Sequence, residues 1–166
     1  MNDEAAQRHP RDHRTRPPLG ARRMAALGRS ECLKLLAGVP LGRVVFTKDA
    51  LPAIRPVNHV VADDAIIIRT HEGAALTTAT AGADGSGTVV AYEADAIDPD
   101  THLGWSVVIT GYARPVTDPD DLVRYEQLLQ PWVDAPMTRT VRIDPELVTG
   151  FRLTEQLPAP GTAAPE

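Results

Sequence analysis

The chain has 166 residues, of which 43% are hydrophobic, and its formal net charge is −5. This length suits one domain, and the apolar content is sufficient for a single core. No run of about 18 apolar residues occurs, so no helix of this sequence is expected to cross a bilayer. The composition therefore predicts a soluble protein without a membrane partner.

Charge is unevenly distributed along the chain. Residues 1–23 hold six arginines against three acidic residues, which leaves a net charge of −8 on the remainder. An acidic body with two lysines lacks the basic face that nucleic acid requires, so no nucleic-acid partner is expected. Residues 1–24 are predicted to be a disordered Arg/Pro-rich arm, residues 25–156 the folded domain, and residues 157–166 a disordered tail.

The cysteine content and the N-terminal sequence bear on the cellular compartment. Cys32 is the one cysteine, which excludes an intrachain disulfide and fits a reducing cytoplasm. Arg22 and Arg23 precede an apolar stretch, as in an export signal, but charged residues interrupt that stretch from Arg29 onward. A cytoplasmic protein is therefore expected.

Helices are expected at three places. Ser30 is a good N-cap for a short helix that ends before Pro40. A second short helix is expected over residues 73–79. The third begins at Asp118, which can cap it, with Pro119 in the first helical position and acidic residues in the first turn.

Short runs of β-branched and apolar residues predict strands between these helices. Pro56 has no N–H to donate, so its strand should be bulged or at an edge near that point. Asp63 and Asp64 predict a tight turn between two paired strands, and Gly111 predicts a bulge. The expected strands are residues 42–47, 53–61, 65–70, 88–93, 105–116, 138–143 and 148–154.

Six or seven strands with a few short helices exclude a doubly wound α/β fold, because the crossover helices are missing. The chain should therefore be mainly β and close as an antiparallel barrel. Small barrels leave little room inside, so a ligand site is expected at an open edge or at a subunit interface.

The order of six segments carries a family resemblance. GRVVFT, RPVNHVV, IIIRTHEGAAL, VVAYEAD, GWSVVITGYA and VRIDPELVTGF together resemble the flavin-binding proteins related to pyridoxamine 5'-phosphate oxidase, especially the branch with nitroimidazole-resistance reductases. The resemblance covers roughly residues 27–154. It implies an antiparallel split β-barrel and a homodimer with two FMN sites at its interface.

The resemblance also implies which residues hold the cofactor. In such proteins the strand similar to RPVNHVV runs beside the isoalloxazine ring, and the strand end and turn similar to RTHEGAAL approach the phosphate. The opening of the long strand commonly reaches the flavin from the partner chain. The implied cofactor-binding residues are, in that order, Arg55, Val57 and Asn58; Arg69, Thr70, Gly73, Ala74 and Ala75; and Trp105 and Ser106.

The chemistry of four of these residues agrees with that assignment. Arg69 and Thr70 offer a guanidinium and a hydroxyl beside the start of a helix, as a phosphate requires. Trp105 can cover a flat ring system, and the Asn58 amide can both donate to and accept from its polar edge.

The same residues also have structural interpretations. Arg69 can pair on the surface with Glu72 or Glu93. Trp105 can belong to core or dimer packing, and Asn58 can satisfy backbone groups at a bulge. These alternatives remain open at the level of sequence.

One segment departs from the family pattern. Related sequences often read Gly-Thr-Lys-Leu where this chain reads GAAL over residues 73–76, and that lysine contacts the flavin phosphate. Ala75 cannot form this contact. The departure favours weaker FMN binding or a different ligand.

The leading functional hypothesis is an FMN-binding oxidoreductase that reduces or oxidises an unknown small molecule. The flavin carries such chemistry, and no catalytic side chain is assigned. His59 and His71 lack the close His or Cys partners of a metal site, so no metal is expected. The alternatives are a reductase that depends on a deazaflavin coenzyme, or a non-catalytic split barrel that binds flavin or haem.

Overall fold

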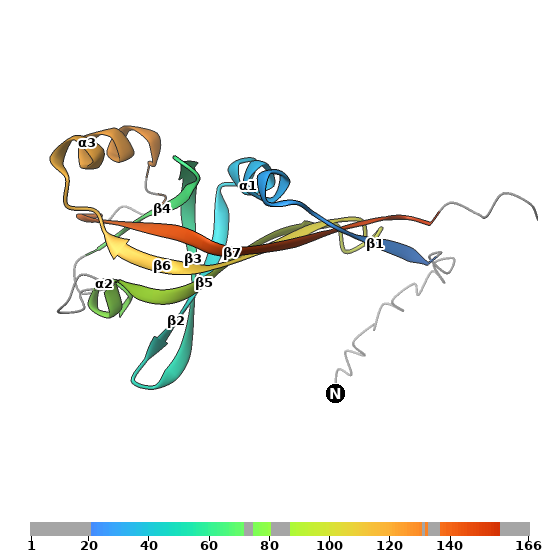
Figure 1. The fold of residues 1–166 in the computed structure, drawn as a ribbon, viewed down its shortest axis with the longest axis horizontal. Coiled ribbons are helices and arrows are strands. Elements are labelled where there is room, and N and C mark those ends of the chain that lie inside the picture. Colours follow the sequence, from blue (N-terminus) through green and yellow to red (C-terminus); the bar gives the residue numbers. More distant parts are fainter. Residues whose placement is uncertain (1–20, 72–74, 81–86, 131, 133–136, 157–166) are drawn as a thin grey trace, which may run out of the picture.

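The computed structural model describes residues 21–71, 75–80, 87–130, 132 and 137–156 (Figure 1). No helix in these ranges is long and apolar enough to cross a membrane. The strands are β1 (Arg22–Ala26), β2 (Leu41–Lys48), β3 (Leu51–Ala62), β4 (Ala65–Thr70), β5 (Thr88–Ile97), β6 (Gly104–Pro115) and β7 (Arg139–Glu155). The helices are α1 (Arg29–Ala37), α2 (Ala75–Thr80) and α3 (Pro119–Leu128).

The strands form one antiparallel sheet that closes on itself. The order is β1-β7-β4-β3-β2-β5-β6, and β6 pairs back with β7. β7 pairs with β6 along most of its length, while its other edge meets β4 over residues 139–143 and β1 over residues 151–155. The predicted fold class, a mainly β antiparallel split barrel with a few short helices, is confirmed.

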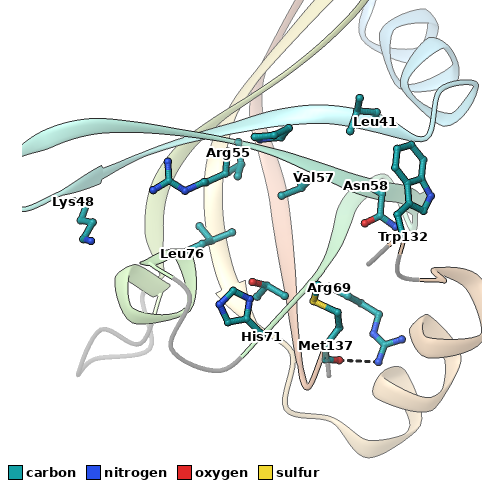
Figure 2. A pocket seen from close by; sticks show the side chains of 13 residues that line it. Leu41, Lys48, Arg55, Val57, Asn58, Arg69, His71, Leu76, Trp132 and Met137 are labelled. Atoms are coloured by element: carbon teal, nitrogen blue, oxygen red, sulfur yellow. Dashed lines mark hydrogen bonds between the residues drawn. The ribbon is translucent and has the colours of Figure 1, made fainter. Parts of the chain in front are cut away.

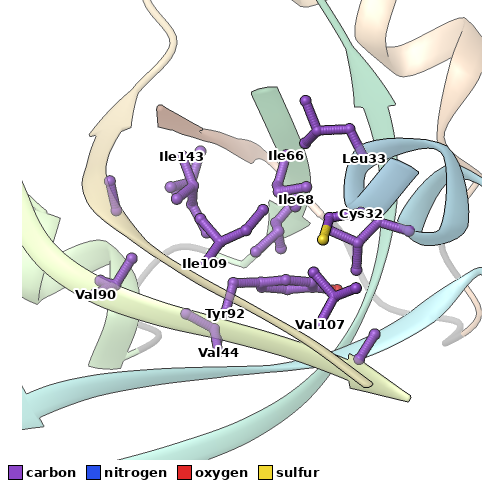
Figure 3. Packing of buried hydrophobic residues seen from close by; sticks show 14 of the residues in the cluster. Cys32, Leu33, Val44, Ile66, Ile68, Val90, Tyr92, Val107, Ile109 and Ile143 are labelled. Atoms are coloured by element: carbon purple, nitrogen blue, oxygen red, sulfur yellow. The ribbon is translucent and has the colours of Figure 1, made fainter. Parts of the chain in front are cut away.

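The core fills the barrel and continues under α1 (Figure 3). Alternate residues of β6, beginning with Trp105, point inward, and all four residues 65–68 of β4 are buried. From α1, Cys32, Leu33 and Leu36 are buried in the same cluster. Burial of these side chains explains why a short helix with few helix-favouring features is stable here, since packing rather than propensity fixes most short helices.

Several local predictions are confirmed. β3 and β4 form the expected hairpin, with φ of 50° at Asp63 and 56° at Asp64, as a primed turn requires. The Asp118 side chain accepts hydrogen bonds from two N–H groups in the first turn of α3. The pairing of β6 with β7 shifts register between Thr110 and Gly111, where a Cβ would collide with the Asp144 carbonyl. The extra residue is in β7, opposite Gly111, so the bulge predicted at Gly111 is present in this pair of strands.

Three local predictions are wrong. Gly28, not Ser30, is the N-cap of α1, because the helix begins at Arg29, two residues earlier than a cap at Ser30 would place it. The two last strands are one strand, β7, because the bulge near Pro145 lets it bend without ending. β1 was not predicted, and its residues 22–24 fall in the arm expected to be disordered; pairing with the free edge of β7 stabilises a segment with no strand pattern of its own.

Candidate functional site

The site lies where β3 and β4 separate. The two strands pair only from His59 to Ala62, while the end of β4 stays on β7. Residues 51–58 of β3 therefore pair with β2 alone, and the β2–β3 hairpin projects beyond the barrel (Figure 1). A cavity of about 610 Å³ opens between this free edge and the end of β4 (Figure 2). It is lined by Leu41, Val44, Lys48, Arg55, Pro56, Val57, Asn58, Arg69, Thr70, His71, Leu76, Trp132 and Met137.

The free edge of β3 explains the position of Pro56. The His59 N–H donates to the Pro40 carbonyl at 3.0 Å, so His59 is a hydrogen-bonded position against the segment that leads into β2. Hydrogen-bonded and non-bonded positions alternate in antiparallel pairs, so the Pro56 nitrogen faces the free edge. A missing N–H costs nothing there, and the prediction that this strand lies at an edge near Pro56 is confirmed.

Five of the predicted cofactor residues line this cavity: Arg55, Val57, Asn58, Arg69 and Thr70. Gly73 and Ala74 lie outside the described residues. Ala75 begins α2, but its side chain also lies outside them, and Leu76 from the next position faces the cavity.

Trp105 and Ser106 lie elsewhere in the chain. Trp105 is 8% exposed and packs in the core, which agrees with its structural interpretation. Ser106 points to the opposite face of β6, where it lines an outer hollow with Met24, Val108 and Phe151. Within one chain neither residue reaches the cavity; a role for them from a partner chain stays a prediction.

The Arg69 guanidinium is held by groups on one side of the cavity. It donates to the Glu126 carboxylate at 2.9 Å, to the Met137 carbonyl at 2.8 Å and to the Leu129 carbonyl at 3.5 Å. Figure 2 shows it turned toward α3. The suggested pairing with Glu93 is wrong, because Glu93 pairs with Arg43 at 3.2 Å; Glu72 lies outside the described residues.

Asn58 contacts the same segment after α3. Its Nδ2 donates to the Gln130 carbonyl at 2.9 Å. Arg69 and Asn58 together therefore bind the backbone of Leu129, Gln130 and Met137. Met137 also lines the cavity. Asn58 satisfies a backbone group, as its structural interpretation had it.

A buried polar pair lies next to the cavity on the inner face of β3. His59 Nε2 lies 3.0 Å from the Leu36 carbonyl, which can only accept, so this nitrogen carries the proton. Nδ1 then accepts from the Tyr92 hydroxyl at 2.7 Å. Burial disfavours the imidazolium and lowers the pKa of His59, and burial raises the pKa of Tyr92 well above its usual value. Both groups are neutral at pH 7.

A family model described as pyridoxamine 5'-phosphate oxidase matches residues 28–152, most of the chain. The chain belongs to the pyridoxamine 5'-phosphate oxidase family. The resemblance inferred from the sequence is therefore confirmed.

Three similar proteins illustrate the range of this family. The chain is 52% identical over 136 residues to the uncharacterized protein Rv0080 of Mycobacterium tuberculosis, covering 82% of this chain and 90% of that protein. The FAD binding protein from Mycobacterium smegmatis is 34% identical, with a TM-score of 0.59 over 78% of this chain and 98% of that chain. A Bacteroides thetaiotaomicron protein, named as a candidate 5-nitroimidazole antibiotic resistance protein, is 10% identical, with a TM-score of 0.59 over 83% and 95% of the chains. At that identity the likeness shows the fold alone.

Sequence reasoning missed several residues that line the cavity of this pyridoxamine 5'-phosphate oxidase family member. Lys48 was detectable: the two-residue turn pairs it with Leu51, so it lies on the same face of the hairpin as Arg55. Trp132 and Met137 come from a connection without periodic pattern and gave no signal. The missed residues are Leu41, Val44, Lys48, Pro56, His71, Leu76, Trp132 and Met137.

Proposed function

We propose that this protein is a flavin-dependent oxidoreductase that binds FMN in the cavity beside β3 and acts on a small molecule in the cytoplasm. The observation that carries the proposal is a 610 Å³ cavity on a free strand edge of a pyridoxamine 5'-phosphate oxidase family barrel. This volume falls within the range of small-molecule and cofactor sites. A relative at 34% identity is named an FAD binding protein, which supports a flavin as the ligand class.

The residues present fit a planar ligand with a polar edge and an anionic tail. Val44, Val57 and Leu76 supply apolar surface to a ring system. No described strand pairs with the free edge of β3 over residues 51–58. Backbone N–H and C=O groups of this edge can therefore meet the alternating donors and acceptors of a flavin's uracil-like edge, although the Ile54 carbonyl already accepts from the Arg55 guanidinium. Lys48 and Arg55 supply positive charge. The donor set thus fits a flavin nucleotide.

The flavin would supply the redox chemistry, and the chain's own groups bind and orient it. Trp132 and Met137 add apolar surface to the cavity lining. His71 lines the same cavity and is a candidate group for proton exchange with a substrate.

We also propose that the working form is a homodimer. Met24 is 68% and Leu147 60% exposed on the outer surface of β1 and β7, and Val108 is 37% exposed on neighbouring β6. Met24 and Val108 line the hollow that contains Ser106. Apolar groups gathered on one outer face favour burial against a second copy, which would also bring Ser106 toward a shared site.

An absorbance spectrum of the freshly purified protein tests the flavin proposal. We expect flavin bands, with release of FMN on denaturation; a deazaflavin or haem would give a different spectrum. Colourless protein that also fails to take up added FMN would refute it. Light scattering tests the dimer separately, and a monomer at micromolar concentration would exclude it.

A further inference from the structure

His59 lies where strand β3 changes partners. β3 pairs with β2 over residues 51–58 and with β4 over residues 59–62. The His59 backbone N–H donates to the Pro40 carbonyl at 3.0 Å, which ties the residue before β2 to the same point. The cavity opens directly beyond this junction, because its two walls, β3 and the end of β4, diverge there.

The His59 side chain joins this junction to α1 and β5. Nε2 donates to the Leu36 carbonyl, in the last turn of α1, at 3.0 Å, and Nδ1 accepts from the Tyr92 hydroxyl of β5 at 2.7 Å. A Cβ at Gly42 would collide with that hydroxyl, so β2 passes directly against it. Both rings are buried, and water therefore replaces neither hydrogen bond while the junction is closed.

Three residues of the cavity lining are immediate neighbours of this junction. Asn58 precedes His59 in β3, and Leu41 follows the accepting proline at the start of β2. Val44 pairs with the tyrosine across β2 and β5. A change at the junction is therefore transmitted to the cavity wall through bonded and paired residues.

Among the described residues, the groups that face the imidazole are neutral. They are the Leu36 carbonyl, the Tyr92 hydroxyl and, from β4, the apolar side chain of Ile68. Burial raises the pKa of the Tyr92 hydroxyl and of the Cys32 thiol on α1, so both stay protonated at neutral and acid pH.

The charged residues of the same elements point elsewhere. Glu31 and Lys34 of α1 are exposed, and Glu93 of β5 points to the outer face, where it pairs with Arg43. An imidazolium at His59 would thus be buried without a counter-charge from these elements, which is costly.

A proton added to Nδ1 is incompatible with the closed junction. Nδ1 becomes a donor and no longer accepts from the Tyr92 hydroxyl, and the charged ring is stable only where water reaches it. Acid pH therefore favours a state in which His59 has left both the hydroxyl and the Leu36 carbonyl. In that state α1 and the start of β2 have lost their tie to β3.

We propose that His59 is a proton-sensitive hinge of the cavity. Transfer of one proton from solvent to Nδ1 breaks the hydrogen bond from Tyr92, separates α1 from β3 at the junction and weakens ligand binding. The identity of the ligand rests on the proposed flavin function, whereas the opening of the junction does not depend on it.

The single cysteine of the chain reports this opening without a ligand. Cys32 is buried in α1 one turn before Leu36, so release of that turn exposes its thiol. 4,4'-Dithiodipyridine labels thiols at acid pH, and the rate for the urea-unfolded chain at each pH corrects for intrinsic reactivity. We expect the corrected rate to rise as pH falls from 6.5 to 5, by up to about tenfold per pH unit, the limit for one proton. His59→Gln should abolish the rise.

Urea below the unfolding transition distinguishes the hinge from global unfolding. Local opening exposes little surface, so the labelling rate at pH 5 should respond only weakly to urea. A response as steep as that of global unfolding would overturn the hinge.

Tyr92→Phe provides a second variant that keeps His59. It removes the donor to neutral Nδ1 and so destabilises the closed junction, which should move the onset of labelling upward by about one pH unit. Tyr112→Phe removes a partly exposed hydroxyl elsewhere and should leave the onset unchanged. Equal onsets in the two variants would contradict the hinge.

FMN titrations from pH 8 to 5 read the effect on the cavity. The Kd should rise at acid pH in the chain with His59 and much less in His59→Gln, and this comparison cancels the titration of the FMN phosphate. Both chains carry His71→Gln, because His71 lines the cavity and its own protonation would favour an anion, the opposite sign.

The outcomes separate the hinge from the flavin proposal. If FMN binds at no pH, the proposed function is refuted, and the Cys32 rates still decide whether the junction opens. If FMN affinity has the same pH dependence in both chains and labelling stays flat, the hinge is overturned while flavin binding stands. Labelling that rises without a change in FMN affinity would refute control of the cavity by His59.

Discussion

Removal of one buried hydroxyl tests the polar pair beside the cavity. Tyr92→Phe deletes the donor to His59 Nδ1, a bond of 2.7 Å between side chains that are 0% and 3% exposed. The ring stays, so no large cavity forms, but His59 Nδ1 loses its donor in a site closed to water. Leaving a buried polar atom without a partner costs about 1–3 kcal/mol. We expect the free energy of unfolding to fall by that amount.

Urea unfolding followed by far-UV circular dichroism measures this change. At a typical slope of about 2 kcal/mol/M, the midpoint should fall by roughly 0.5–1.5 M at unchanged slope. Protomer concentration must be held constant, because subunit association would add to the apparent stability. Tyr112→Phe is the matched control: Tyr112 is 37% exposed, and the change should stay within about 0.5 kcal/mol. Equal midpoints for both variants would refute the reasoning.

Three further predictions follow from the same contacts. Because the pKa of buried His59 is lowered, stability should be full above about pH 6.5, the usual histidine pKa, and decline as pH falls below it; a His59→Gln variant should lack this decline in urea midpoints taken from pH 8 to 5. Gly42→Ala places a Cβ within 2.7 Å of a β5 carbonyl and should lower the melting temperature by several degrees, whereas Gly28→Ala, with nothing within 4 Å, should lower it much less. Deleting residues 1–20 should leave the melting temperature unchanged, and deleting residues 1–26, which removes β1, should lower it; equal effects would show that β1 contributes nothing.

The fold was predictable because strands and turns carry local signals. The run of residues 65–70 and the Asp63-Asp64 turn defined the central hairpin, and Asp118 with Pro119 marked α3. β1 was not predictable, because residues 22–26 have no alternation and become a strand only through the free edge of β7. Propensity describes a residue's local preference, whereas an edge strand depends on a partner more than 100 residues away.

The site was predictable in part for a similar reason. The family resemblance located the β3 and β4 segments, which follow strand periodicity and therefore keep their register. The side-chain partners of Arg69 and Asn58 lie in and after α3, at long sequence separation, and could not be inferred. The chain has two tryptophans, and the resemblance implied that Trp105 contacts the cofactor. The tryptophan that lines this chain's cavity is Trp132, which lies on a connection without a periodic sequence pattern.

The single strand β7 also constrains the order in which the chain can fold. It is the partner of β1, β4 and β6, and it pairs Glu155 with Arg22 and Ile143 with Ile66. On the ribosome the hairpins β2–β3, β3–β4 and β5–β6 can form early, but their outer edges stay unpaired until β7 emerges. Such edges recruit other nascent chains, and closure through distant contacts is slow. Protein yield should therefore depend on chaperone capacity and synthesis rate, and loss of β7 should leave β1 without a partner and one edge of both β4 and β6 unpaired.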